Sequence, residues 1–400
     1  MRLLTLLLWG LLQVASPAAP LPTLRIAAGD HDRSHVILSI DLPPGIPAVK
    51  ALRGPDGELL PAQQGLDGRL TFIEPRLPRQ TSRDYTLLSN PEFNPAPHVA
   101  TVSLHDDQLV FTDIPPPPLT FQMQPSALPD PSIDPIYRRG AYLHPILTPA
   151  GTRVSDDYPA NHLHHHGIWF AWTKTEFQER HPDFWNMGQK RGTVEFDQLL
   201  DRWNGPVHAG FRSRHIHRDL TSPDHPVALS ETWEVRHFQN PATRDRYHVF
   251  EIVTRQECAT DNALILPEYH YGGLGFRGHG DWDGAANCDF LTSEGEQDRV
   301  KGHATRGRWC YIGGRVNGKQ AGLVILCHPD NFRAPQPMRI HPTEPFFCFA
   351  PQQLGEMRIE PGKPYVSRYR CYAVDGPPNR DLFESFYQDY AHPPVATLHP

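Results

Sequence analysis

The segment ALSETWEVRHF, residues 228–238, largely alternates apolar or aromatic side chains with polar ones, and RYHVFEIVTRQE, residues 246–257, continues this pattern. An alternation with a period of two places the apolar side chains on one face of a β-strand. Pro, Asn and Asp, which favour turns, bound both segments. Short strands separated by such turn residues indicate an all-β sandwich or barrel.

Strand-like segments of the same kind recur along most of the chain, whereas one segment has the pattern of a helix. The further strand-like segments include residues 35–42, 69–75, 100–113, 192–200, 321–329 and 367–374. In residues 379–394, Leu382, Phe383, Phe386, Tyr387 and Tyr390 share one helical face, Asn379 can cap the start and Pro393 and Pro394 end the helix. We therefore expect a large antiparallel β-sandwich with a short C-terminal helix.

The N-terminus has the layout of an export signal, and a proline-rich stretch divides the remaining chain. One arginine, an apolar run and small residues make up residues 1–18, as in a secretory signal peptide. A retained N-terminal anchor is the alternative. We expect an N-terminal β region over residues 19–130 and a main domain over residues 131–392. The proline-rich residues 114–135 either separate these two parts or wrap the main sandwich as an ordered arm.

Composition argues against several classes of protein. The formal charge is -7 and no basic stripe is present, so nucleic acid is not an expected partner. No segment after residue 18 approaches the roughly 20 apolar residues of a membrane-spanning helix. The chain has only six cysteines, four of which lie in apolar, strand-like runs, and we interpret those four as small buried core residues. The mature protein is expected to be exported to the periplasm or secreted.

The sequence NHLHHHGIW, residues 161–169, concentrates four imidazoles in five positions. If it is a strand, His162, His164 and His166 share one face and Leu163 and His165 the other. Such imidazoles can transfer protons and bind hydroxyl groups, and two of them can bind a metal ion with a third ligand from elsewhere. An exposed polar strand is the alternative.

Several polar and aromatic residues elsewhere could complete such a site. Carboxylates can orient imidazoles, aromatic side chains in loops can stack on sugar rings, and polar residues at the ends of strands often carry function. Each also has a structural explanation as a turn residue, a loop packed on the core or a surface side chain. The candidates are Arg139, His144, Asp157, Trp185, Tyr271, Arg277, His328, Asn331, Arg333 and, as a general base, Glu344.

Five segments in this order resemble a family labelled "methane oxygenase PmoA", otherwise a domain of unknown function. They are RGAYLHPILTPAG, DDYPANHLHHHGIWFAW, DFW, YGGLGFR and HPDNFRAP, and the resemblance covers roughly residues 136–375. Asn161 and His166 stand where the family pattern has an acidic residue and an arginine. The resemblance implies a galactose-mutarotase-like supersandwich with His and Arg around a sugar groove. It carries no methane chemistry to this chain, because the methane enzyme subunit of that name is an integral membrane protein.

These features lead to a primary hypothesis and two alternatives. The primary hypothesis is an exported carbohydrate-active protein that binds a sugar or glycan without a required cofactor. His144, His162, His164 and His165 would perform acid/base catalysis of the epimerase, lyase or hydrolase type. Arg139, Arg277 and Arg333 would hold the substrate's polar or charged groups, and Trp185 and Tyr271 would stack on its ring. The alternatives are a zinc or copper protein based on His162 and His164, and a non-catalytic glycan-binding module.

Overall fold

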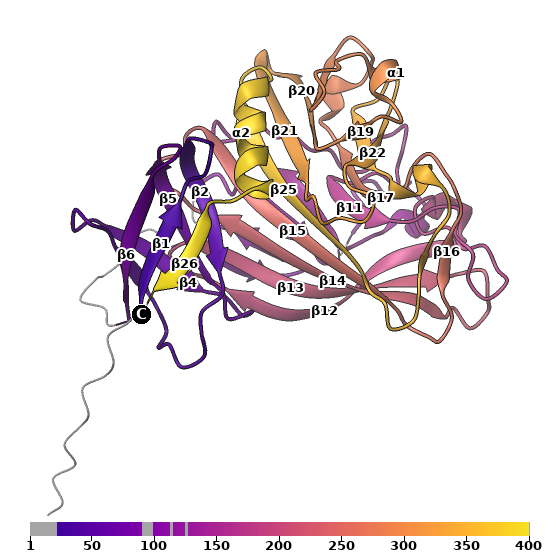
Figure 1. Ribbon diagram of the computed structural model, residues 1–400. Coiled ribbons are helices and arrows are strands. Elements are labelled where there is room, and N and C mark those ends of the chain that lie inside the picture. The colour runs from indigo at the N-terminus through magenta and orange to yellow at the C-terminus, as the bar shows by residue number, and fades with distance from the viewer. Residues whose placement is uncertain (1–21, 90–98, 113–114, 125–126, 400) are drawn as a thin grey trace, which may run out of the picture.

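The computed structural model describes residues 22–89, 99–112, 115–124 and 127–399, and the regular secondary structure of these residues consists mainly of antiparallel β-sheets. The expected signal peptide, residues 1–18, lies outside the described residues. Two large sheets face each other, and a third sheet adjoins them at one end (Figure 1). The predicted all-β antiparallel sandwich with an N-terminal β region and a short C-terminal helix is confirmed.

The eight-stranded sheet contains the segments with the strongest alternation. In the strand Val227–Phe238, Trp233 and Val235 are buried, whereas Glu234 and Arg236 lie on the other, partly exposed face. In spatial order its strands are β12 (Gly192–Trp203), β13 (His208–Asp219), β14 (Val227–Phe238), β15 (Tyr247–Cys258), β25 (Tyr365–Asp375), β21 (Lys319–Cys327), β20 (Trp309–Val316) and β18 (Cys288–Thr292).

The nine-stranded sheet packs against the buried face of the eight-stranded one. The ring centroids of Phe121 in the nine-stranded sheet and Phe211 in the eight-stranded sheet lie 4.6 Å apart. Phe349 of the nine-stranded sheet stacks on Tyr369 of the eight-stranded sheet at 5.6 Å. In spatial order its strands are β19 (Arg306–Gly307), β22 (Gln336–Ile340), β23 (Phe346–Phe349), β17 (Gly273–Arg277), β11 (Ile168–Ala171), β10 (Tyr142–Ile146), β9 (Leu119–Gln122), β8 (Gln108–Phe111) and β7 (Val102–His105).

The seven-stranded sheet combines the first strands of the chain with the last one. The strand Val395–His399 pairs with Thr23–Ala27, so residues from both ends of the chain meet in one sheet. Its spatial order is β2 (Arg33–Ile40), β5 (Leu70–Leu77), β4 (Leu59–Gln64), β3 (Ala51–Arg53), β6 (Ser82–Leu88), β1 (Thr23–Ala27) and β26 (Val395–His399).

Strands β7 to β9 belong to the nine-stranded sheet, although the sequence analysis assigned residues 19–130 to the N-terminal region. The proline-rich stretch supplies β9, whose residues Leu119–Gln122 are all buried. These residues therefore lie inside the nine-stranded sheet, and the division of the chain near residue 130 stays a prediction. Whether the N-terminal sheet folds independently stays a prediction.

Short elements complete the fold. The two-stranded sheet joins β16 (Leu264–Leu266) to β24 (Met357–Ile359), and α1 spans Arg299–Gly302. Helix α2 (Arg380–Ala391) starts at Asn379, whose side chain accepts a hydrogen bond from the Leu382 backbone N–H, as predicted. The 3-10 helices are η1 (Pro135–Tyr137), η2 (Met187–Gln189), η3 (Gly280–Trp282) and η4 (Pro351–Leu354).

Helix α2 covers the outer face of the eight-stranded sheet (Figure 1). The Phe386 ring stacks on Tyr372 of β25 with centroids 3.8 Å apart, and Phe383 stacks on Tyr311 of β20 at 5.3 Å. The cysteines predicted to be core residues, Cys310, Cys327, Cys348 and Cys371, are all buried and none forms a disulfide. Neither helix of the described chain combines the length and the apolar character that a bilayer crossing needs.

Candidate functional site

The histidine-rich segment forms turns, not the strand that alternation suggested. The His162 N–H donates to the Pro159 carbonyl at 2.9 Å, and the His165 N–H donates to the His162 carbonyl at 2.8 Å. Gly167 then lets the chain approach β10, because a Cβ at this position would lie 2.1 Å from the Leu143 carbonyl oxygen. Strand β11 begins only at Ile168. The expectation that His162, His164 and His166 share a strand face is therefore wrong.

These turns direct three of the four imidazoles into one small pocket. His162, His164 and His165 line it, and its volume is about 130 Å³. His166 points elsewhere: it is fully buried, and its Nδ1 lies 2.6 Å from an oxygen of Asp157. The other residues that line this histidine pocket are Trp185, Asn186, Tyr271, Arg339, His341 and Phe346.

The histidine pocket lies on the side of the nine-stranded sheet away from the eight-stranded one. Trp169 and Phe170 are neighbours in β11 and point to opposite faces of the sheet. Phe170 contacts Tyr365 of β25 with centroids 6.5 Å apart, whereas Trp169 lies 5.1 Å from the His165 ring. The pocket therefore faces outward from the sandwich.

A carboxylate held by an arginine lies beside His162. Oε2 of Glu344 is 2.9 Å from Nδ1 of His162 and 3.0 Å from Nη1 of Arg277. The Arg277 side chain is completely buried, and its Nη2 also donates to Asp283 at 2.7 Å and to Asn161 at 3.3 Å. Burial alone would raise the pKa of Glu344, but the hydrogen bond with His162 and the nearby positive charges lower it. Glu344 is thus an ionised side chain fixed against His162, which lines the pocket.

Three of the imidazoles around the pocket, those of His164, His165 and His341, favour their neutral form. Burial lowers the pKa of His164 to about 3 and that of His341 to about 4. Burial also lowers the pKa of His165 well below its usual value. A neutral imidazole keeps one nitrogen lone pair, which can accept a proton or a hydrogen bond or bind a metal ion.

His165 is held in a stack of aromatic rings. Its ring lies 4.6 Å from His162 at an interplanar angle of 18° and 4.7 Å from Phe346 at 26°. The residue is 3% exposed, and its Nδ1 has no hydrogen-bond partner. Donor atoms of His162, His165 and Glu344 lie within 4.8 Å of one another, so these three residues could hold a metal ion.

The structure brings together seven of the residues predicted from the sequence, with Glu344 among them. Trp185 and Tyr271 line the pocket with His162, His164 and His165, although Trp185 is almost completely buried and closes the floor more than it offers a free face. Arg277 reaches the pocket through Glu344.

The other selected residues have different partners. His144 Nδ1 contacts Ser155, Asp157 bonds His166 and Tyr142, and Arg139 is buried and donates to the Phe170 carbonyl. Asn331 donates to the Arg368 carbonyl of β25, and Arg333 donates to the Pro351 and Gly355 carbonyls, which gives both a structural role there. The expectation that they converge on the histidines is wrong. The residues placed at the pocket without having been predicted are Asn186, Arg339, His341 and Phe346.

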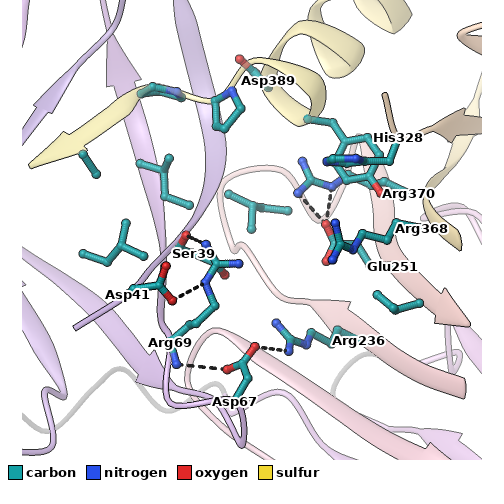
Figure 2. A pocket seen from close by; sticks show the side chains of 18 of the residues that line it. Ser39, Asp41, Asp67, Arg69, Arg236, Glu251, His328, Arg368, Arg370 and Asp389 are labelled. Atoms are coloured by element: carbon teal, nitrogen blue, oxygen red, sulfur yellow. Dashed lines mark hydrogen bonds and ion pairs between the residues drawn. The ribbon is translucent and has the colours of Figure 1, made fainter. Parts of the chain in front are cut away.

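His328 lies in a separate and larger groove of about 690 Å³, between the seven-stranded sheet and the outer face of the eight-stranded one. Figure 2 shows charged side chains from both sheets pointing into this groove. They are largely paired with one another: Arg236 with Asp67 at 2.9 Å, and Arg370 with Glu251 at 2.6 Å (Figure 2). The groove therefore holds structural ion pairs and is a weaker candidate than the histidine pocket.

A second group of two histidines and one glutamate lies between the two large sheets. Nε2 of His217 is 2.9 Å from Glu231, and Nδ1 of His215 is 4.0 Å from it. All three residues are 0% exposed. Glu231 also accepts hydrogen bonds from Trp233, Thr254 and Gln256. We call these three residues the core cluster, and His162, His165 and Glu344 the pocket cluster.

Comparisons with known proteins give a family without an assigned activity. The profile described as "Family of unknown function (DUF6807)" matches residues 117–388. No curated protein matches the chain. A solved structure of a protein in glycosyl hydrolase family 38 from Enterococcus faecalis has 8% sequence identity and a TM-score of 0.42. The alignment covers 96% of this chain and 48% of that one, so the chain spans about half the length of that structure.

Proposed function

The chain belongs to this family of unknown function, DUF6807, and from its pocket we propose an exported carbohydrate-active protein that binds a sugar in the histidine pocket. The observation that carries the proposal is the ionised Glu344, which the buried Arg277 holds against His162, a residue that lines the pocket. Fixed charges and imidazoles at a pocket wall are suited to binding hydroxyl groups and moving protons.

The chemistry of the pocket lining supports a sugar over an apolar ligand. His164, Asn186 and Arg339 offer hydrogen-bond donors and acceptors, as a ring with several hydroxyl groups requires. Tyr271, which is only partly buried, supplies aromatic surface on which the apolar face of such a ring can lie. The volume of about 130 Å³ suits one sugar unit, either a free monosaccharide or the end of a chain.

His164 is the group we assign to proton transfer. It lines the pocket and lies next to the other two imidazoles, with centroids 5.5 Å from His162 and 4.7 Å from His165. The proton would pass between a sugar carbon or hydroxyl group and the imidazole. Epimerisation, elimination and hydrolysis all use such a transfer, so the test must detect all three products.

The test measures binding and turnover of glucose, galactose, mannose and their 1,4-linked disaccharides by calorimetry and product chromatography. We expect His164→Ala to abolish binding or turnover, because the imidazole contacts the sugar directly. His328→Ala, in the separate groove, is the matched control and should leave both unchanged. Binding that His164→Ala abolishes, without any product from the unmodified protein, would identify a glycan-binding module. Equal loss in both variants would refute the pocket as the site.

A further inference from the structure

We propose that His162, His165 and Glu344 bind a divalent transition-metal ion, with zinc as the first candidate. The inference deepens the proposed function, on which it rests for the catalytic role of the ion, because it adds a cofactor to the same pocket. Two imidazoles and one carboxylate are a ligand set of catalytic zinc sites. The same set also binds iron(II) in sites with open positions.

The geometry needs only a small adjustment to accept an ion. The donor atoms of the three residues lie within 4.8 Å of one another. Zinc–ligand bonds are about 2.0–2.2 Å long, so donor atoms on one ion lie no more than about 4 Å apart. Small rotations of the His162 and His165 rings would close this difference. The 2.9 Å contact between His162 and Glu344 would then give way to two metal–ligand bonds.

The turn places His165 beside His162. The His165 N–H donates to the His162 carbonyl, so the two residues are three positions apart across one turn. Their rings are stacked 4.6 Å apart, whereas His164 meets His162 at 5.5 Å with an interplanar angle of 61°. The donor atoms that lie within 4.8 Å of one another belong to His162, His165 and Glu344, so this set contains His165 instead of the His164 expected for a strand.

A second observation, independent of the donor spacing, also indicates a ligand. His165 is 3% exposed and lines the pocket, and its Nδ1 has no hydrogen-bond partner. A buried polar atom without a partner is destabilising. Coordination of an ion by an imidazole nitrogen of His165 would offset this destabilisation.

The residues behind the ligands fit a metal centre. Arg277 holds Oε2 of Glu344, which leaves Oε1 for the ion, and metal-binding carboxylates commonly have such hydrogen-bonded support. Asp283 lies 2.7 Å from Arg277 and offsets its positive charge. The rest of the pocket, including His164 and Arg339, leaves room for water or a sugar hydroxyl as a further ligand. An open position of this kind marks a catalytic rather than a structural zinc site.

The test titrates zinc chloride into the chelator-treated, full-length mature protein without a polyhistidine tag and follows binding by calorimetry. We expect one ion per chain, and loss of this binding in His165→Phe, which keeps the aromatic stack but removes the nitrogen ligands. His162→Ala is the second ligand variant and should also lose binding. His328→Ala should bind zinc as the unmodified chain does. Circular dichroism and thermal unfolding check that each variant is folded.

The outcomes separate the metal from the sugar. Zinc binding that survives in folded His165→Phe or His162→Ala, or the absence of stoichiometric binding by the unmodified chain, would overturn the metal proposal. Sugar binding by the chelator-treated protein is measured in parallel with the sugars named above. If it persists while zinc fails to bind, the proposed function stands without a metal. If zinc binds as expected and no sugar does, the metal site stands and the carbohydrate proposal fails.

Discussion

The pocket cluster and the core cluster contain the same side chains, two histidines and a glutamate, but lie on opposite faces of the nine-stranded sheet. Glu231 in the core accepts bonds from Trp233, Thr254 and Gln256 as well as from His217. Glu344 at the pocket shares one oxygen between His162 and Arg277, and 13% of its side chain is exposed. The core carboxylate is therefore saturated, and the pocket carboxylate is not.

Unpartnered nitrogens alone do not distinguish the two clusters. Nδ1 of His165 and Nδ1 of His217 are both buried without a hydrogen-bond partner. The difference lies in access and in the carboxylate, since the pocket opens beside His165 whereas His217 is sealed between two sheets. A group of ionisable residues thus indicates a site only when a ligand can reach it and its bonding capacity is incomplete.

The largest expected effect is a difference in stability when the glutamate of each cluster is removed. Glu231→Ala should lower the free energy of unfolding by about 3–5 kcal/mol, because it leaves several buried donors without an acceptor. Glu344→Ala should cost about 1–2 kcal/mol, since Arg277 keeps its bond to Asp283. Urea unfolding measures both values. A larger loss for Glu344→Ala than for Glu231→Ala would contradict the distinction.

Acid should destabilise the core cluster in a defined pH range. Burial alone would raise the pKa of Glu231, but its bond with His217 and the other donors lower it to about 2 from the usual 4.5. Its contribution is therefore complete above pH 4.5 and is lost as the pH falls toward 2, an effect of about 3 kcal/mol.

Protonation of His215 should begin to lower the stability of the protein at a higher pH than protonation of Glu231 does. Burial lowers its pKa to about 3 from 6.5, so the folded state binds fewer protons than the unfolded chain between these values. Stability should fall as the pH drops below 6.5. Urea midpoints from pH 7.5 to 3.5 measure the profile. His215→Phe should reduce the slope between pH 6.5 and 4.5 by the share of one histidine, since other buried histidines titrate in the same range, and Glu231→Gln should reduce the slope below 4.5. Unchanged profiles in both variants would refute the assignment.

Replacement of one histidine in each cluster by phenylalanine sharpens the comparison at a smaller scale. His165→Phe should change the free energy of unfolding by less than about 1 kcal/mol, because its contacts are stacked rings. His215→Phe should cost about 1–3 kcal/mol, since it removes the 2.8 Å bond with Ser213 and leaves that buried hydroxyl unpaired. Thermal and urea unfolding measure the free energy of unfolding of both variants. Equal losses in the two variants would contradict the prediction.

The smallest effect concerns chemical access. The His162 side chain is 30% exposed, and that of His217 is 0% exposed. Diethylpyrocarbonate should therefore modify His162 in the folded protein and leave His217 unmodified, as mass spectrometry of peptides can determine. Modification of both residues at the same rate would mean that the core cluster opens to solvent.

The strand pattern and the terminal helix could be predicted from sequence, because alternation and capping act over a few neighbouring residues. The conformation of the histidine segment could not. Four imidazoles have no apolar period, and the turn depends on Gly167 packing against Leu143, which is distant in sequence. Residue type identified Arg277 and Glu344, but it also selected Asn331 and Arg333, whose hydrogen bonds hold loops. Only tertiary structure shows which polar groups already have partners.

The pairing of Thr23–Ala27 with Val395–His399 has a consequence for biogenesis. During synthesis, strand β1 can pair with β6 early. Its other edge stays unpaired until β26, near the end of the chain, has been made. An unpaired strand edge is a template for association with other chains. Premature termination before residue 395 should therefore yield a product that has every residue of the histidine pocket and nevertheless tends to aggregate through its first strand.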